Sequence, residues 1–178
     1  MDRLYLTMLA VAASTIVRPA TALNVVNASA PEVNDAFGTD VTVTDMTSPI
    51  FGGGFLQSRI FQQAGGTWVY EYRLDLRDAE SITNVPYATS VGLSTGPVLS
   101  TKATGEVFVI TAGGLGTIGL RSASGLFGYH TFEFTTLVWA GDTSYFWGYV
   151  SSSPPQVVTA TVATSNGNIQ LNAYAPHW

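Results

Sequence analysis

Residues 67–76, with the sequence TWVYEYRLDL, decide the fold class of this chain. Large apolar side chains recur at every second position from Trp68 to Leu76, and Glu71, Arg73 and Asp75 alternate with them. A period of two places alternate side chains on opposite faces of an extended strand. The stretch therefore predicts a half-buried antiparallel strand with an aromatic face toward the core.

The same pattern recurs on both sides of this stretch. Residues 55–62 lie before Gly65-Gly66 and predict a hairpin with residues 67–76, and Asn166-Gly167 predicts a second hairpin between residues 157–164 and 169–174. Further runs rich in β-branched and aromatic residues are 41–43, 106–111, 130–135 and 144–150. Roughly ten short strands predict one antiparallel β-sandwich or jelly roll, with a closed β-barrel as the alternative.

The composition fits an exported β-protein and excludes several classes of partner. The chain has 178 residues, a single-domain length, and only 11% of them are charged, against roughly 25% in average proteins. The formal net charge is -5, and Lys102 is the single lysine. Without a basic patch we expect no binding to nucleic acid or to anionic membranes. No cysteine is present, so no disulfide framework is expected.

Residues 1–22 have the pattern of a signal peptide. Arg3 supplies a small positive region, residues 4–17 are largely apolar, and Ala20-Thr21-Ala22 is a cleavage site with small residues at both key positions. The apolar stretch is too short to span a bilayer, which takes about 20 residues. We therefore expect cleavage after Ala22, a mature domain over residues 23–178, and secretion.

Two glycine motifs resemble catalytic signatures but lack the context that these need. Residues 114–119 match G-x-G-x-x-G, and residues 92–96 match G-x-S-x-G. Both signatures require a helix that begins at the motif, and no helical periodicity follows either one. The sequence predicts turns here, with neither a nucleotide site nor a serine nucleophile, and we expect no cofactor.

The titratable residues suggest no metal site and at most one weak catalytic alternative. The two histidines, His130 and His177, are too few for zinc, and His130 is expected to pack among aromatic residues. Glycoside hydrolysis needs two carboxyl groups that face each other across the sugar. Glu71, Glu133 and Asp142 are the candidates for a small glycoside hydrolase, which is the least favoured function.

The aromatic residues leave two interpretations open. Trp139, Tyr145, Trp147 and Tyr149 are dense enough to form a platform on which sugar rings stack, or they belong to the core. Large apolar side chains are mostly buried, which favours the core. An exposed Trp139 or Trp147 would favour a carbohydrate-binding module.

Two segments resemble domains of bacterial exported proteins of the PEP-CTERM type. These are residues 68–74, an early aromatic strand, and residues 140–146 followed by 151–155, a Gly-Asp-Thr-Ser turn before a late aromatic strand. The resemblance spans residues 55–165 and implies a secreted β-sandwich of the cell surface or exopolysaccharide matrix, without known catalysis. The chain departs from that family in ending at Ala175-Pro176-His177-Trp178, without Pro-Glu-Pro, an apolar helix or a basic tail.

These observations together predict a secreted, non-enzymatic protein with a structural or adhesive role at the cell surface or in the extracellular matrix. The alternative is a carbohydrate-binding module that uses the aromatic platform. The expected partners are polysaccharides or other surface proteins. Few charges protect the sheet edges, so we also expect that copies of the chain can associate through them.

Overall fold

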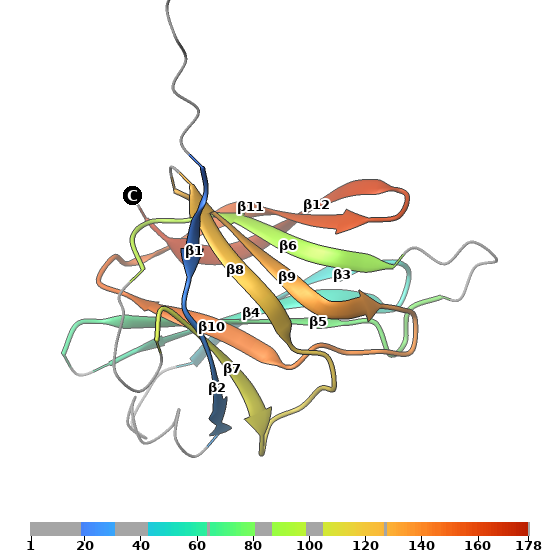
Figure 1. Ribbon diagram of the computed structural model, residues 1–178, viewed down its shortest axis with the longest axis horizontal. Coiled ribbons are helices and arrows are strands. Elements are labelled where there is room, and N and C mark those ends of the chain that lie inside the picture. The colour runs from blue at the N-terminus through green and yellow to red at the C-terminus, as the bar shows by residue number, and fades with distance from the viewer. Residues whose placement is uncertain are drawn as a thin grey trace, which may run out of the picture.

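The chain folds into two β-sheets that pack face to face (Figure 1). The computed structural model describes residues 19–30, 43–63, 65–80, 87–98, 105–126 and 128–177. Within these ranges the strands are β1 (Thr21–Leu23), β2 (Val25–Ser29), β3 (Val43–Ile50), β4 (Gly54–Gln62), β5 (Trp68–Asp75), β6 (Ala88–Ser94), β7 (Val107–Ala112), β8 (Leu120–Leu126), β9 (Tyr129–Val138), β10 (Phe146–Ser151), β11 (Pro155–Thr164) and β12 (Gly167–Pro176). The predicted all-β sandwich is confirmed, with twelve strands in place of roughly ten. None of the helical structure in these ranges is long and apolar enough to cross a membrane.

Each sheet has six strands. The order in the first, here called the β9 sheet, is β1-β8-β9-β6-β11-β12, and the order in the second, the β5 sheet, is β2-β7-β10-β5-β4-β3. Neighbouring strands are antiparallel except β2 and β7, which are parallel. Both sheets are open, with an edge strand on each side, so the chain does not form the alternative of a single closed sheet.

The N-terminal segment contributes an edge strand to both sheets. Only Asn24 separates β1 from β2, and the chain passes there from the β9 sheet to the β5 sheet (Figure 1). Thr21 and Ala22 pair with Gly125 and Ser124 of β8. The predicted cleavage point after Ala22 therefore lies within β1, while residues 1–18 of the predicted signal peptide are outside the described residues.

Aromatic rings from both sheets form the centre of the core. Tyr72 of β5 and Tyr149 of β10 face Phe132 of β9, whose ring is nearly parallel to that of Tyr149 at a centroid distance of 6.0 Å. Trp147 meets Phe134 edge-on at 5.4 Å. Such offset and edge-to-face pairs stabilise a core beyond the burial of their area.

Polar groups inside this aromatic core are linked to one another. The hydroxyl oxygens of Tyr72 and Tyr149 lie 2.8 Å apart, and Tyr149 also donates to Thr95 Oγ1 at 3.1 Å. The Tyr72 hydroxyl group donates to the carbonyl oxygen of Tyr174 on β12 at 2.7 Å. Buried hydroxyl groups need such partners, and these hydrogen bonds join β5 and β10 of one sheet to β12 of the other.

The strand β5 is antiparallel as predicted, but it is buried on both faces. The prediction of a half-buried strand was wrong for Glu71, Arg73 and Asp75, each of which is at most 5% exposed. On this outer face the Arg73 guanidinium lies 3.3 Å from Asp75 and 5.0 Å above the Phe146 ring. A second apolar cluster surrounds them, formed by Ala28, Val69, Phe108, Ile110, Phe146 and Val150. The ion pair and the aromatic contact offset part of the cost of burying Arg73 and Asp75, and the described residues supply no such pair for Glu71.

Candidate functional site

Two of the four residues of the predicted aromatic platform are core residues. Trp147 and Tyr149 have no exposed surface, because β10 lies between β5 and β7 in the middle of its sheet and both its faces are covered. Sugar stacking requires an exposed ring face, so the prediction that these two residues form a platform was wrong. The alternation correctly predicted that Phe146 lies on the opposite face of the strand from Trp147 and Tyr149, but both faces of β10 are buried.

Trp139 is exposed and lies against a second aromatic residue that the sequence did not indicate. It follows β9, 45% of its surface is exposed, and its ring centroid lies 4.9 Å from that of Tyr87, which precedes β6. The two rings are tilted by 52°. The Asp142 carboxylate accepts a hydrogen bond from the Trp139 backbone N–H at 3.1 Å and so holds the turn after β9 in place.

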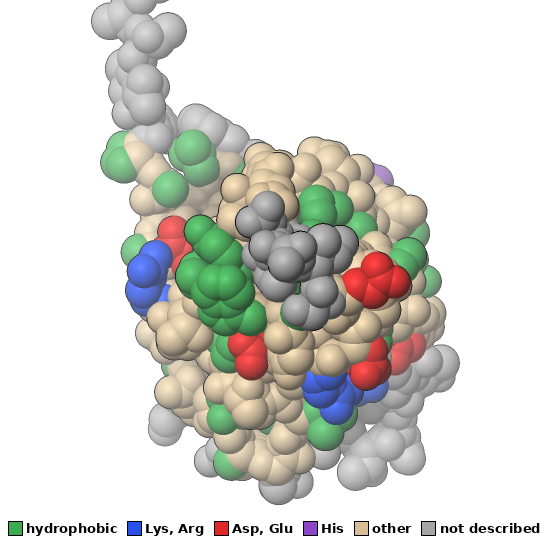
Figure 2. Space-filling view, turned by 90° about the vertical axis from the view of Figure 1, so that its right-hand side faces the viewer, with side chains coloured by type: hydrophobic (Ala, Val, Ile, Leu, Met, Phe, Trp, Pro, Cys, Tyr) green, Lys and Arg blue, Asp and Glu red, His purple; other side chains and the backbone are tan. Residues whose placement is uncertain are grey.

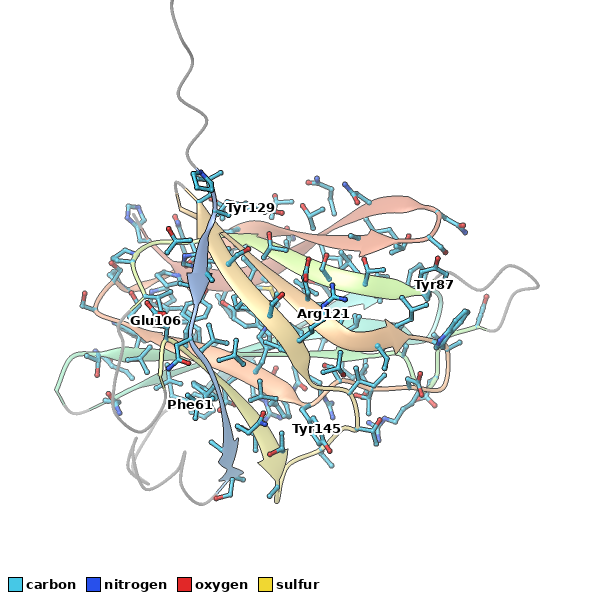
Figure 3. The ribbon with its side chains drawn as sticks, in the orientation of Figure 1. Phe61, Tyr87, Glu106, Arg121, Tyr129 and Tyr145 are labelled. Carbon is cyan, nitrogen blue, oxygen red and sulfur yellow. The ribbon has the colours of Figure 1, made fainter. Side chains whose placement is uncertain are left out.

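This aromatic pair lies at one end of the sandwich. Figure 2 looks onto that end, where hydrophobic side chains gather beside both acidic and basic side chains on a surface that is mostly uncharged. Figure 3 shows Tyr87 at this end and Tyr129, at the start of β9, at another. An exposed ring that packs against a second, partly buried ring beside hydrogen-bonding groups is suited to a ligand with both an apolar face and polar edges.

Tyr145, the fourth platform residue, lies elsewhere. It is half-buried, packs against the main core, and its backbone N–H donates to the Ile118 carbonyl oxygen at 2.8 Å. Figure 3 shows it well apart from Tyr87. The structure thus leaves Trp139 as the one predicted platform residue with an exposed ring, and adds Tyr87 to it.

The three candidate carboxylates of a glycoside hydrolase do not converge. Glu133 is on the β9 sheet, where Arg121 donates to it at 2.8 Å and Ser122 at 2.7 Å, and these hydrogen bonds lower its pKa. Glu71 is on the β5 sheet, and Asp142 caps the turn after β9. No two of these groups face each other across one cleft, as hydrolysis of a glycosidic bond needs.

A cavity of about 350 Å³ opens on the outer face of the β5 sheet, away from the β9 sheet. Its polar groups are the side chains of Arg59 and Glu71, which are opposite each other on β4 and β5. Figure 3 shows Phe61, another of its wall residues, on this outer side. The other lining residues are Ala30, Ile110, Gly113, Gly114, Leu115 and Phe146.

Glu71 is the only carboxyl group among the described residues that line this cavity. Burial raises its pKa to about 7, although the positive charge of Arg59 acts in the opposite direction. Arg59 itself donates to the Asp45 carboxylate at 3.1 Å and lies 4.6 Å above the Phe146 ring. A buried carboxyl with a perturbed pKa in a cavity is a candidate for ligand binding.

The two glycine motifs have structural roles. The segment after β7 is held by Thr117 N–H, which donates to the Thr143 carbonyl oxygen, and a Cβ on Gly116 would lie 2.1 Å from the Ser144 carbonyl oxygen. Ser94 ends β6 opposite Tyr129, at the other end of β9 from Asp142. Ten residues of strand, roughly 30 Å, separate the two ends, so a serine triad is not assembled.

His130 is a core residue, as expected. It is 9% exposed, its ring lies edge-on to Tyr149 at 6.1 Å, and burial lowers its pKa. The second histidine, His177, lies next to the C-terminal residue, and its backbone lies close to Gly96. No group of three or more potential metal ligands occurs in the part of the chain that the structure describes.

Comparison of the chain with protein-family models, with curated proteins and with solved structures found no match. The resemblance to exported proteins of the PEP-CTERM type therefore rests on sequence pattern. The structure places the first of its two segments in β5, at the centre of the sandwich, and the second in the connection from β9 to β10, which crosses between the sheets.

Proposed function

We propose that this chain is a secreted, non-enzymatic adhesive protein of the cell surface or extracellular matrix, and that it holds polysaccharide at Tyr87 and Trp139. The observation that carries the proposal is the exposed ring of Trp139, which packs against the partly buried Tyr87 at the end of the sandwich. The signal-peptide pattern of residues 1–22 and the resemblance to exported matrix proteins support the location.

The geometry of the pair favours a glycan over an apolar ligand. Trp139 and Tyr87 are two neighbouring rings with a tilt, so a flexible chain of sugars can lay its C–H faces against them. The surface shown in Figure 2 is mostly uncharged and polar, with a few acidic and basic groups. Such a rim can hydrogen bond to hydroxyl groups, while a purely apolar ligand would leave it without partners.

The test is retention of the purified chain on insoluble and extracted polysaccharides, with tryptophan fluorescence as a second readout. We expect binding with a change in tryptophan emission that is lost in Trp139→Ala, and Trp147 should not contribute because it is buried. Trp139→Ala should weaken binding about tenfold or more, and Trp139→Phe should weaken it less, because Phe keeps an aromatic ring.

Tyr129→Ala is the matched control, because Tyr129 is an exposed aromatic residue on the same strand but at its other end. It should bind as the wild-type protein does. The proposal is wrong if no polysaccharide retains the wild-type chain, or if Trp139→Ala binds as tightly as the wild type. The first outcome would leave a purely structural role.

A further inference from the structure

The cavity on the outer face of the β5 sheet takes no part in the proposed adhesion. We propose that it is a second carbohydrate site, which binds one neutral sugar unit between Glu71 and Arg59. The inference rests on the proposed function for the class of ligand, but it uses other residues on another face of the molecule.

The first argument is a buried carboxyl for which the described residues supply no hydrogen bond. Glu71 is only 5% exposed and lines the cavity, yet no hydrogen bond or ion pair joins its carboxyl group to the other described residues. Buried polar groups are almost always bonded, so a carboxyl beside a cavity with no hydrogen-bond partner among the described residues is suited to accept a donor from a ligand there. A volume of about 350 Å³ is in the range of small-molecule sites.

The second argument is the balance of charge, which selects an uncharged ligand. Arg59 lies opposite Glu71 and is also paired with Asp45 from β3, while β7 and β10 contribute only uncharged residues such as Ile110 to the cavity. A cation would meet Arg59, and an anion would meet Glu71. A hydroxyl group can donate to the carboxylate and accept from the guanidinium, so a polyhydroxy ligand fits both groups.

The third argument is the combination of apolar walls with an open mouth. Phe61, which is partly exposed, offers a surface for the C–H face of a sugar ring, and the buried Phe146 completes the apolar wall beside it. Gly113 and Gly114 border the cavity without side chains, and a Cβ on Gly114 would lie only 2.8 Å from Ile110 Cγ2. Because these two residues have no side chains, their backbone itself can form part of the cavity wall.

The test is ligand-observed NMR and calorimetry on the full chain at pH 8, above the pKa of Glu71, which is about 7. The probes are the methyl glycosides of glucose, galactose, mannose and N-acetylglucosamine, with acetate and methylammonium as charged probes. We expect at least one glycoside to bind. Glu71→Gln should weaken that binding about tenfold, because the amide replaces a charged acceptor.

Arg59→Lys is the second variant, because it keeps the charge but loses the planar fork of donors, and it should also weaken binding. Glu133→Gln, on the opposite sheet, should bind the glycoside as the wild type does. The proposal is overturned if no glycoside binds, if Glu71→Gln binds equally well, or if only a charged probe binds. Polysaccharide retention that depends on Trp139 alone would uphold the proposed function and overturn this site.

Discussion

At the scale of single residues, Glu71 shows how burial changes the chemistry of one group. Its carboxyl lies on the outer face of β5, where Val69 of the same strand and Phe146 of β10 belong to an apolar cluster, and the residue is only 5% exposed. Transfer of a charge from water into such surroundings is costly, and protonation avoids that cost. The raised pKa of Glu71 therefore links its ionisation to the stability of the fold.

Glu71→Gln is expected to stabilise the protein at pH 8 relative to the wild type, and much less at pH 5. The unfolded carboxyl releases its proton near pH 4.5, while the folded one keeps it until about pH 7. The wild type therefore loses stability as the pH rises through this window, by at most about 3 kcal/mol. Urea unfolding of both proteins at several pH values would measure the difference.

Glu133→Gln is the control for this experiment. Arg121 lowers the pKa of Glu133, so its ionised form is the one that the fold favours, and it is partly exposed. The stability of Glu133→Gln relative to the wild type should not rise between pH 5 and pH 8. A parallel pH dependence of Glu71→Gln and the wild type would show that Glu71 ionises freely in the folded protein.

Residue-level features were only partly predictable from sequence. Alternation assigned Trp147 and Tyr149 to one face of a strand, but it cannot tell whether neighbouring strands cover that face. Trp139 lies beyond the end of β9, and its partner Tyr87 lies before β6, in a region without a periodic pattern. Their contact depends on the pairing of β6 with β9, which no local pattern encodes.

At the scale of elements, the hairpin of β11 and β12 was predicted from Asn166-Gly167, and the structure refines its turn. Thr164 pairs with Gly167, so Ser165 and Asn166 are the central residues. Among the described non-glycine residues only Phe51 has a positive φ, whereas φ is +109° at Gly167. The turn therefore places its left-handed residue after the two central residues, as in hairpins with a glycine bulge.

Gly167→Ala is expected to lower the free energy of unfolding by about 1 kcal/mol, because a side chain disfavours this φ. No atom lies within 4 Å of the added Cβ, so the cost is conformational. Gly119→Ala is the matched control: its Cβ would make only ordinary contacts, at 3.8 Å and beyond, and its φ is not in the left-handed region. Thermal unfolding should show a loss for Gly167→Ala and none for Gly119→Ala.

The strands that sequence reasoning missed share a physical reason. β1 has only three residues, and β8 consists largely of small and polar residues. β6 overlaps the G-x-S-x-G match at residues 92–96, where the sequence predicted a turn. The parallel pairing of β2 with β7 joins segments about eighty residues apart. Such strands are stabilised by their neighbours in the sheet and not by their own pattern, so tertiary context decides them.

At the scale of the whole molecule, side chains of the β5 sheet close part of one open edge of the β9 sheet. Ser48 of β3 donates to the Asn172 carbonyl oxygen at 2.6 Å, and Ser58 of β4 accepts from the Tyr174 backbone N–H at 3.1 Å. Both acceptor and donor belong to the edge strand β12. An edge whose backbone groups are already bonded offers fewer sites for another strand.

The double variant Ser48→Ala, Ser58→Ala is therefore expected both to destabilise the chain and to make it associate. Each lost hydrogen bond costs about 1 kcal/mol, and both serines are buried, so water cannot easily replace them. The freed groups of Asn172 and Tyr174 would extend the unpaired edge of β12, so sedimentation should become more dependent on concentration than in the wild type. Ser152→Ala, at an exposed serine, is the control and should change neither property. If the double variant loses stability but sediments as the wild type does, β12 is not the edge through which copies of this chain meet, and β1, β2 and β3 become the edges to test.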